Sequence, residues 1–143
     1  MEEQVFGGGA SKPGQRHVLE AMRRGFLSRC PQCGRGRLFR AFLKISDRCP
    51  DCGEELHHHR ADDLPAYLVI VIVGHIVVGA FLGVDAATNW SYWFHLAIWA
   101  PATLLFSLLL IGPVKGAVVG LQWALRMHGF GGERDILETH PEL

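Results

Sequence analysis

Positive charge is missing from the middle of this sequence. Residues 64–112 contain no lysine or arginine and a single acidic residue, Asp85, whereas residues 1–63 hold 11 of the 14 basic and 9 of the 14 acidic residues. The formal net charge of the whole chain is zero. A strong field that would attract nucleic acid is therefore absent, and the two parts of the chain are suited to different solvents.

Cysteine is absent outside two five-residue stretches. Cys30-Pro31-Gln32-Cys33-Gly34 and Cys49-Pro50-Asp51-Cys52-Gly53 hold all four cysteines, separated by two, fifteen and two residues. This spacing predicts a zinc site in which two tight turns each supply two thiolates to one tetrahedral ion. The glycine after each pair is suited to the positive φ angle that turns backbone N–H groups toward the sulfurs. Rubredoxin-type iron and two disulfides are the alternatives.

Signs of catalysis or secretion are missing as well. No nucleophile stands at a usable spacing from a base, and no glycine loop of the phosphate-binding kind is present. The first thirty residues contain no apolar run of the length that a secretory signal needs. We therefore expect a protein that is not an enzyme, and whose cysteines face a reducing compartment that favours metal over disulfides.

The part of the chain before the apolar region is expected to be a small soluble unit. Residues 1–15 are typical of a disordered tail, and residues 16–60 of a zinc ribbon with a helix near 17–27 and a hairpin near 37–45. About 45 residues bury too little apolar surface to fold alone, so metal is expected to supply the missing stability. The apolar stripe of the helix is expected to pack on the ribbon, and it consists of Val18, Leu19, Met22 and Phe26. Contact of the helix's arginines with anionic lipid is the alternative.

Two long apolar runs follow. Residues 64–84 carry no charged side chain, and at 1.5 Å per residue they span the roughly 30 Å core of a bilayer. Residues 92–111 form a second run that begins beside an interfacial aromatic cluster, Trp90, Tyr92 and Trp93. We expect two transmembrane helices joined by a periplasmic loop over 85–91. Because basic residues flank only the other ends of the spans, both termini are expected to be cytoplasmic.

Gly112 and Pro113 are expected to end the second span. Residues 114–128 are too few to cross a membrane, and they place apolar side chains on one face and Lys115, Gln122 and Arg126 on the other. They predict an amphipathic helix that lies on the membrane surface, with Trp123 as its anchor. Residues 129–143 are expected to form a flexible tail.

Histidines within the apolar runs need an explanation, because polar rings are costly in lipid. Depth counting along the two spans predicts that His75 bonds the backbone freed by Pro101, or Thr103. His95 is expected to be hydrated near the outer interface. Haem or copper held by His75 and His95 is the alternative.

Two further patterns lie in and before the first span. Gly79 and Gly83 form a small-xxx-small pattern that is expected to pack against another helix. Directly before the span, Asp62 or Asp63 is expected to cap the helix. A second, weaker metal site built from His57, His58, His59, Asp62 and Asp63 is the alternative.

These motifs together resemble a bacterial family known as domain of unknown function 983. The resemblance runs from about Arg23 to Leu125 and rests on the two cysteine stretches, on His59-Arg60-Ala61-Asp62-Asp63 and on Val73-Gly74-His75-Ile76-Val77-Val78. It implies a cytoplasmic ribbon with two spans in the bacterial inner membrane. Relatives are often encoded near cytochrome c oxidase and its assembly factors, so the resemblance implies an accessory or assembly role for that oxidase.

The expected fold is a small zinc ribbon with rubredoxin-like knuckles and short β-hairpins. It is fused to an all-α transmembrane hairpin of two helices and to a C-terminal interfacial amphipathic helix. We expect a membrane-anchored adapter whose partners are membrane lipid and an integral membrane complex such as the oxidase. The alternative is iron electron transfer, or copper handling by His57–His59, His75 and His95. A nucleic-acid binder tethered to the membrane is the weaker alternative.

Overall fold

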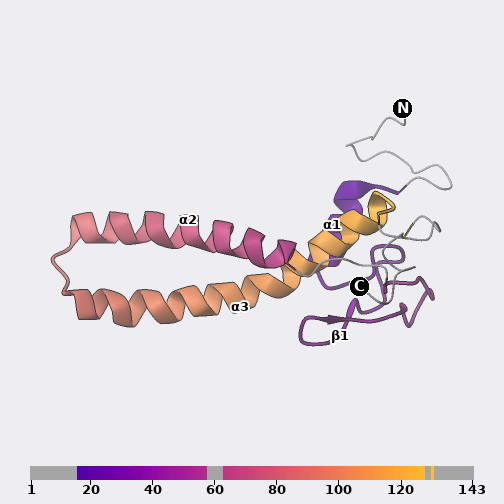
Figure 1. Cartoon of the computed structure of the whole chain (residues 1–143), viewed down its shortest axis with the longest axis horizontal. Coiled ribbons are helices and arrows are strands. Elements are labelled where there is room, and N and C mark those ends of the chain that lie inside the picture. Colours follow the sequence, from indigo (N-terminus) through magenta and orange to yellow (C-terminus); the bar gives the residue numbers. More distant parts are fainter. Residues whose placement is uncertain (1–15, 58–62, 128–129, 131–143) are drawn as a thin grey trace, which may run out of the picture.

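The computed structural model describes residues 16–57, 63–127 and 130, which form a head joined to a long helical hairpin (Figure 1). The elements in order are α1 (Val18–Phe26), β1 (Phe39–Ala41), β2 (Lys44–Ile45), α2 (Leu64–Ala87) and α3 (Tyr92–Ala124). The tail expected over 1–15, the run 58–62 and the tail expected over 129–143, apart from Phe130, lie outside the described residues.

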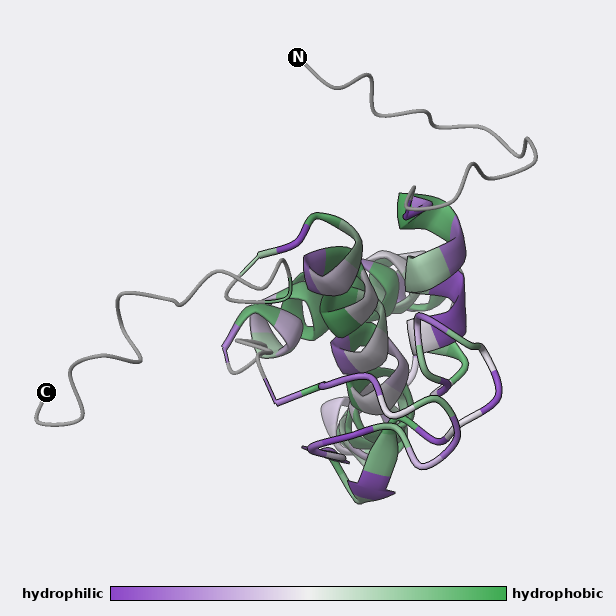
Figure 2. Ribbon diagram, turned by 90° about the vertical axis from the view of Figure 1, so that its right-hand side faces the viewer, coloured by the Kyte–Doolittle hydropathy of each residue, from purple (hydrophilic) through white to green (hydrophobic). Residues whose placement is uncertain are grey.

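The head consists of α1, two cysteine turns and a short antiparallel hairpin. β1 pairs with β2, with Phe39 opposite Ile45. Isolated bridges join Arg29 to Arg37 and Arg48 to Glu55 beside the two cysteine turns. Seen from the head end, hydrophilic residues are spread over its loops, and the long helices lie behind (Figure 2).

α2 and α3 have the length and composition of helices that cross a membrane. They contain 24 and 33 residues, and only 11% and 28% of their most apolar windows are buried within the chain. The loop between them is shorter than expected, because α2 continues to Ala87. Val69 and Val73 of α2 pack on Val114 of α3, so the two helices run antiparallel in contact.

The path of α3 corrects the sequence-based expectation. Gly112 and Pro113 do not end this helix, which continues to Ala124 with Pro113 inside it. A separate amphipathic helix over 114–128 is therefore not present. A proline removes one backbone donor from a helix. Burial after Pro113 offsets this loss: Val114 packs on α2, and residues farther along contact the head, namely Gly116, Val118, Val119, Gly120 and Trp123.

The end of α3 lies in the hydrophobic core of the head. The core cluster joins cysteines and apolar residues of the ribbon to the helix: Ala21, Cys30, Leu38, Ile45, Cys49, Leu56, Val118, Val119, Trp123 and Phe130. Trp123 does not anchor the chain in lipid as expected. Its Nε1–H donates to Glu54 Oε1 at 3.0 Å, and the Arg16 guanidinium lies 4.3 Å from its ring centre. α3 thus supplies apolar surface that a ribbon of this size lacks.

α1 contacts α3 through a face that the sequence pattern did not predict. Its buried residues are Ala21 and Gly25, whereas Leu19 and Phe26 of the expected stripe are exposed. A Cβ added to Gly25 would overlap the backbone carbonyl of Gly116. Close approach of two backbones requires small residues at the crossing, and this requirement outweighs the burial of larger apolar side chains.

Candidate metal centre

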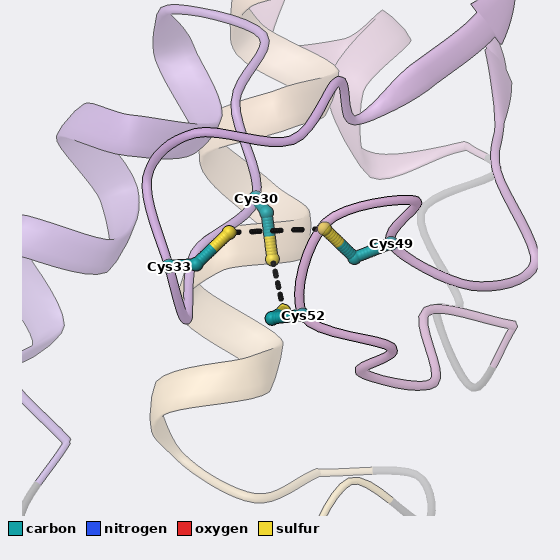
Figure 3. Close-up of side chains that lie close together, drawn as sticks. All are labelled: Cys30, Cys33, Cys49 and Cys52. Carbon is teal, nitrogen blue, oxygen red and sulfur yellow. Dashed lines mark hydrogen bonds between the residues drawn. The ribbon is translucent and has the colours of Figure 1, made fainter.

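The four cysteine sulfurs point toward one another from two facing turns (Figure 3). All four lie within 4.8 Å of one another, and the Sγ–Sγ distance is 3.7 Å for both Cys30–Cys52 and Cys33–Cys49. Ligands at about 2.3 Å around a tetrahedral ion would be separated by about 3.8 Å. A disulfide needs about 2.05 Å. The sulfur spacing therefore matches ligands around one ion, and the four cysteines are free in this structure, without the disulfides of the alternative.

Both cysteine pairs are held by the same type of turn. The Gly34 N–H donates to the Cys30 carbonyl at 2.9 Å, and the Gly53 N–H donates to the Cys49 carbonyl at 3.0 Å. The φ angles of Gly34 and Gly53 are 70° and 75°, which confirms the predicted positive values. A side chain would be strained at either position, so glycine allows each turn to bring its two sulfurs to one side.

Backbone N–H groups point at two of the sulfurs. Arg35 and Gly36 donate to Cys33 Sγ at 3.5 Å, and Asp51 donates to Cys49 Sγ at 3.4 Å. Burial acts to raise the pKa of Cys33, but the N–H groups of Gly36 and Arg35 and the neighbouring thiols lower this pKa to about 7. Burial raises the pKa of Cys30 and Cys52. A bound cation would favour the thiolate at all four positions.

Gly36 is a site residue that the cysteine spacing did not identify. Its N–H donates to Cys33 Sγ, and its carbonyl accepts from the Cys30 N–H at 2.8 Å. A Cβ at this position would overlap Cys49 Sγ. Gly36 therefore contacts both cysteine pairs. The signals in the sequence are a second glycine two residues after Gly34 and the place of Gly36-Arg37-Leu38-Phe39 among the residues of the family resemblance.

Basic side chains surround the first turn. Arg24 Nη1 donates to the carbonyls of Pro31 and Gln32 at 3.1 and 2.7 Å, and Arg29 Nη1 donates to the Gly34 carbonyl at 3.5 Å. Four thiolates around a divalent ion carry a net charge of about −2. These arginines offset that charge, and Arg24 also fastens the turn to α1.

Residues 39–123 match the family described as Protein of unknown function (DUF983). The matched segment begins at β1, includes the second cysteine turn and both long helices, and covers more than half of the chain. The chain belongs to this family. In this DUF983 protein the first cysteine turn precedes the matched residues. No curated protein and no solved structure matches the chain.

The alternative second metal site of the DUF983 protein falls mainly on residues 58–62, which lie outside the described residues. Among residues 16–57, 63–127 and 130, the cysteines form the only group of three or more potential ligands within reach of one ion. Asp63 occupies the N-cap position of α2, but its side chain makes no capping hydrogen bond within the described part of the chain.

The predicted partner of His75 is wrong. Its Nδ1 lies 2.7 Å from the Val71 carbonyl, one turn earlier in α2, and its ring is exposed. The hydroxyl of Thr103 donates to the Trp99 carbonyl at 2.7 Å. Side chains in a helix point back toward the preceding turn, so the imidazole reaches a carbonyl of its own helix without help from α3.

His95 is buried, which corrects the expectation that it is hydrated. The Trp99 Nε1–H donates to His95 Nδ1 at 3.2 Å, and His95 Nε2 lies 3.5 Å from Asp85 Oδ1. His95 and His75 therefore have separate partners, and the geometry does not support a haem or copper shared between them.

Small residues mediate helix packing within this DUF983 protein at α1 and α3, whereas Gly79 and Gly83 have no packing partner within the described residues. Nothing among the described residues lies within 4 Å of a Cβ added to Gly79 or Gly83. The close contact instead joins Gly116 and Gly120 of α3 to α1. The sequence does carry the signal, since residues 116–120 read Gly-Ala-Val-Val-Gly.

Proposed function

We propose that this protein is an adapter that is anchored in the membrane and built around a structural zinc ion. The observation that carries the proposal is the shared core of the head, where Cys30 and Cys49 belong to the same cluster as Val119 and Trp123 of α3. An ion held by the cysteines stabilises the surface of the head. The same core fixes the position of that surface relative to the helical hairpin.

The chemistry of the site supports binding rather than catalysis. Four thiolates complete a tetrahedral shell and leave no open position for substrate or water. Cys30 and Cys49 are buried, so two of the four ligands are shielded from solvent. A closed shell of this kind stabilises a fold, and we propose that the protein is not an enzyme.

The helical hairpin places the adapter in the membrane and offers a surface for contact with a second membrane protein. We propose that α2 and α3 cross the bacterial inner membrane with the head in the cytoplasm, since the loop between them has no basic residue. The open space at Gly79 and Gly83 permits close approach by a helix of another membrane protein. The family resemblance favours the respiratory oxidase or its assembly machinery as that complex.

Iron electron transfer is the second candidate. A rubredoxin-type centre uses the same four sulfurs, and hydrogen bonds to sulfur such as those from Gly36 and Asp51 tune the potential of iron sites. The copper alternative has less support, because the histidines do not converge within the described residues.

Metal analysis of the full-length protein, purified from its own membranes in mild detergent, tests the proposal. We expect one zinc per chain, no visible colour and co-purification of respiratory oxidase components. Iron with charge-transfer absorption would instead establish the electron-transfer candidate. If oxidase subunits never accompany the protein, and oxidase assembly is normal without it, the oxidase has to be abandoned as partner. Cys30→Ser with Cys52→Ser is the control that should lose the ion.

A further inference from the structure

We propose that the head rests on the surface of the bilayer through a lipid-facing edge. This edge consists of Phe42 at the turn between β1 and β2 and of Phe26 and Leu27 at the end of α1. Arg40 and Lys44, on either side of the turn, contact anionic lipid headgroups. The inference depends on the proposed crossing of the membrane by α2 and α3.

Lys115 shows how deep the β1–β2 turn lies along α3. Its Nζ donates to the Leu43 carbonyl at 2.8 Å. The preceding residue, Val114, is buried against Val69 of α2. Val69 is the sixth residue of α2, so it lies about 7.5 Å beyond the start of that helix. The turn therefore lies beside the start of α2, where the apolar run begins (Figure 1).

The end of α1 lies at the same level. The backbone of Gly25 lies close to that of Gly116, the residue after Lys115. The backbone of Ala21 lies close to that of Gly120, which is farther along α3. α1 is thus oriented with its C-terminal end toward the hairpin of long helices. Phe26 and Leu27, which follow Gly25, are 46% and 59% exposed.

The β1–β2 turn is poorly suited to water. Phe42 is 73% exposed, and Leu43 adopts a φ of 58°, where glycine or asparagine would be favoured in a solvated turn. Arg40 and Lys44 are exposed on either side. An aromatic tip between two basic side chains is the pattern that favours the boundary between acyl chains and anionic headgroups.

Photocrosslinking tests this edge in the full-length, metal-bound protein reconstituted in vesicles of phosphatidylcholine and phosphatidylglycerol. p-Benzoylphenylalanine replaces Phe42, Leu105 or Leu125 in turn. Leu105 is 56% exposed on α3 and reports whether the long helices lie in lipid. Leu125 is also apolar and exposed, but it lies ten residues beyond Lys115, about 15 Å farther along the chain of α3. We expect lipid adducts at positions 42 and 105 and none at 125.

The outcomes separate this inference from the function on which it depends. Adducts at 105 without adducts at 42 would overturn the lipid-facing edge and leave the transmembrane helices in place. An absence of adducts at 105 would overturn both. Crosslinks from position 42 to another polypeptide would overturn the lipid contact and show that this edge binds a protein partner. Unchanged metal content shows that each substituted head is folded.

The role of charge is tested by adding Arg40→Gln and Lys44→Gln to the protein labelled at position 42. We expect the adduct yield to fall in vesicles that contain phosphatidylglycerol and to stay constant in phosphatidylcholine alone. An equal yield with and without the two substitutions in the anionic vesicles would overturn the headgroup contact.

Discussion

Among single residues, Gly36 is expected to affect the metal centre although it is not a ligand. Gly36→Ala is expected to displace the Cys49 sulfur, because the added Cβ would overlap it. The same change also disturbs the hydrogen bonds that Gly36 makes to Cys30 and Cys33. We expect the purified variant to lose most of its bound metal, measured as metal content per chain.

Gly53→Ala is the matched control for this prediction. At a φ of 75°, alanine is strained by roughly 1–2 kcal/mol, but nothing among the described residues lies within 4 Å of the added Cβ. This variant should be less stable and still hold metal. If both variants lose metal equally, overlap with the Cys49 sulfur is not what controls occupancy.

Trp123 is the residue that joins the end of α3 to the second cysteine turn. Trp123→Phe retains an aromatic ring beside Arg16 but removes the N–H that donates to Glu54. Hydrogen bonds to charged groups contribute about 1.5–3 kcal/mol. Glu54 is only partly buried, so we expect a loss at the low end of this range. The free energy of unfolding of the head should fall by about 1.5 kcal/mol in a denaturant titration.

Glu54→Gln is the comparison for that variant. It keeps an oxygen acceptor for the Trp123 N–H, so its loss of stability should be smaller. A loss as large as that of Trp123→Phe would show that the charge of Glu54 near Arg16, and not the hydrogen bond, accounts for the effect.

For the secondary-structure elements, the decisive contact is the crossing of α1 and α3. Gly25→Ala would direct a methyl group onto the backbone of Gly116, and backbone cannot move aside as a flexible side chain can. We expect α1 to separate from α3, and the backbone amides of residues 18–26 to exchange hydrogen much faster than in the wild type.

Gly79→Ala and Gly83→Ala make the same glycine-to-alanine change in α2, and they serve as controls for Gly25→Ala. A methyl group at either position meets open space within the described chain. Neither variant should change the exchange rate of α1. A comparable increase in all three variants would mean that the added methyl groups act on helix stability in general, and not on the α1–α3 contact.

For the whole molecule, removal of the metal should loosen the head and leave the helical hairpin folded. The head has only short strands, whereas α2 and α3 are long helices that contact each other through Val69, Val73 and Val114 near the head and through Phe81 and His95 near the other end. With a chelator we expect amide exchange to rise across residues 28–57 while the far-UV circular dichroism of the helices is largely retained. A head that is unchanged after verified metal loss would contradict this expectation.

Acid should act in the same direction as the chelator. Metal binding requires thiolates, so protons compete with the ion, and the affinity for metal falls as the pH decreases. Metal release should therefore precede any loss of helical signal in a pH titration. Cys30→Ser with Cys52→Ser should remove this pH dependence of the head, because the site is then already empty.

The cysteine spacing and the apolar runs by themselves determined the clustering of the four sulfurs and the presence of two long apolar helices. Both are local features: two residues between cysteines set the geometry of a turn, and an uninterrupted apolar run indicates a long helix, although it did not locate the end of α3 at Ala124. The positive φ angles of Gly34 and Gly53 follow from the same local reasoning.

Only the tertiary structure decided how the head is attached to the hairpin. The contact of Gly25 with Gly116, the burial of Trp123 and the continuation of α3 through Pro113 all join segments far apart in the sequence. Periodicity along one segment shows that a face is apolar, but it does not show which partner will cover that face. The partner at the α1–α3 crossing was decided by how closely two backbones approach, which depends on the residues of both helices together.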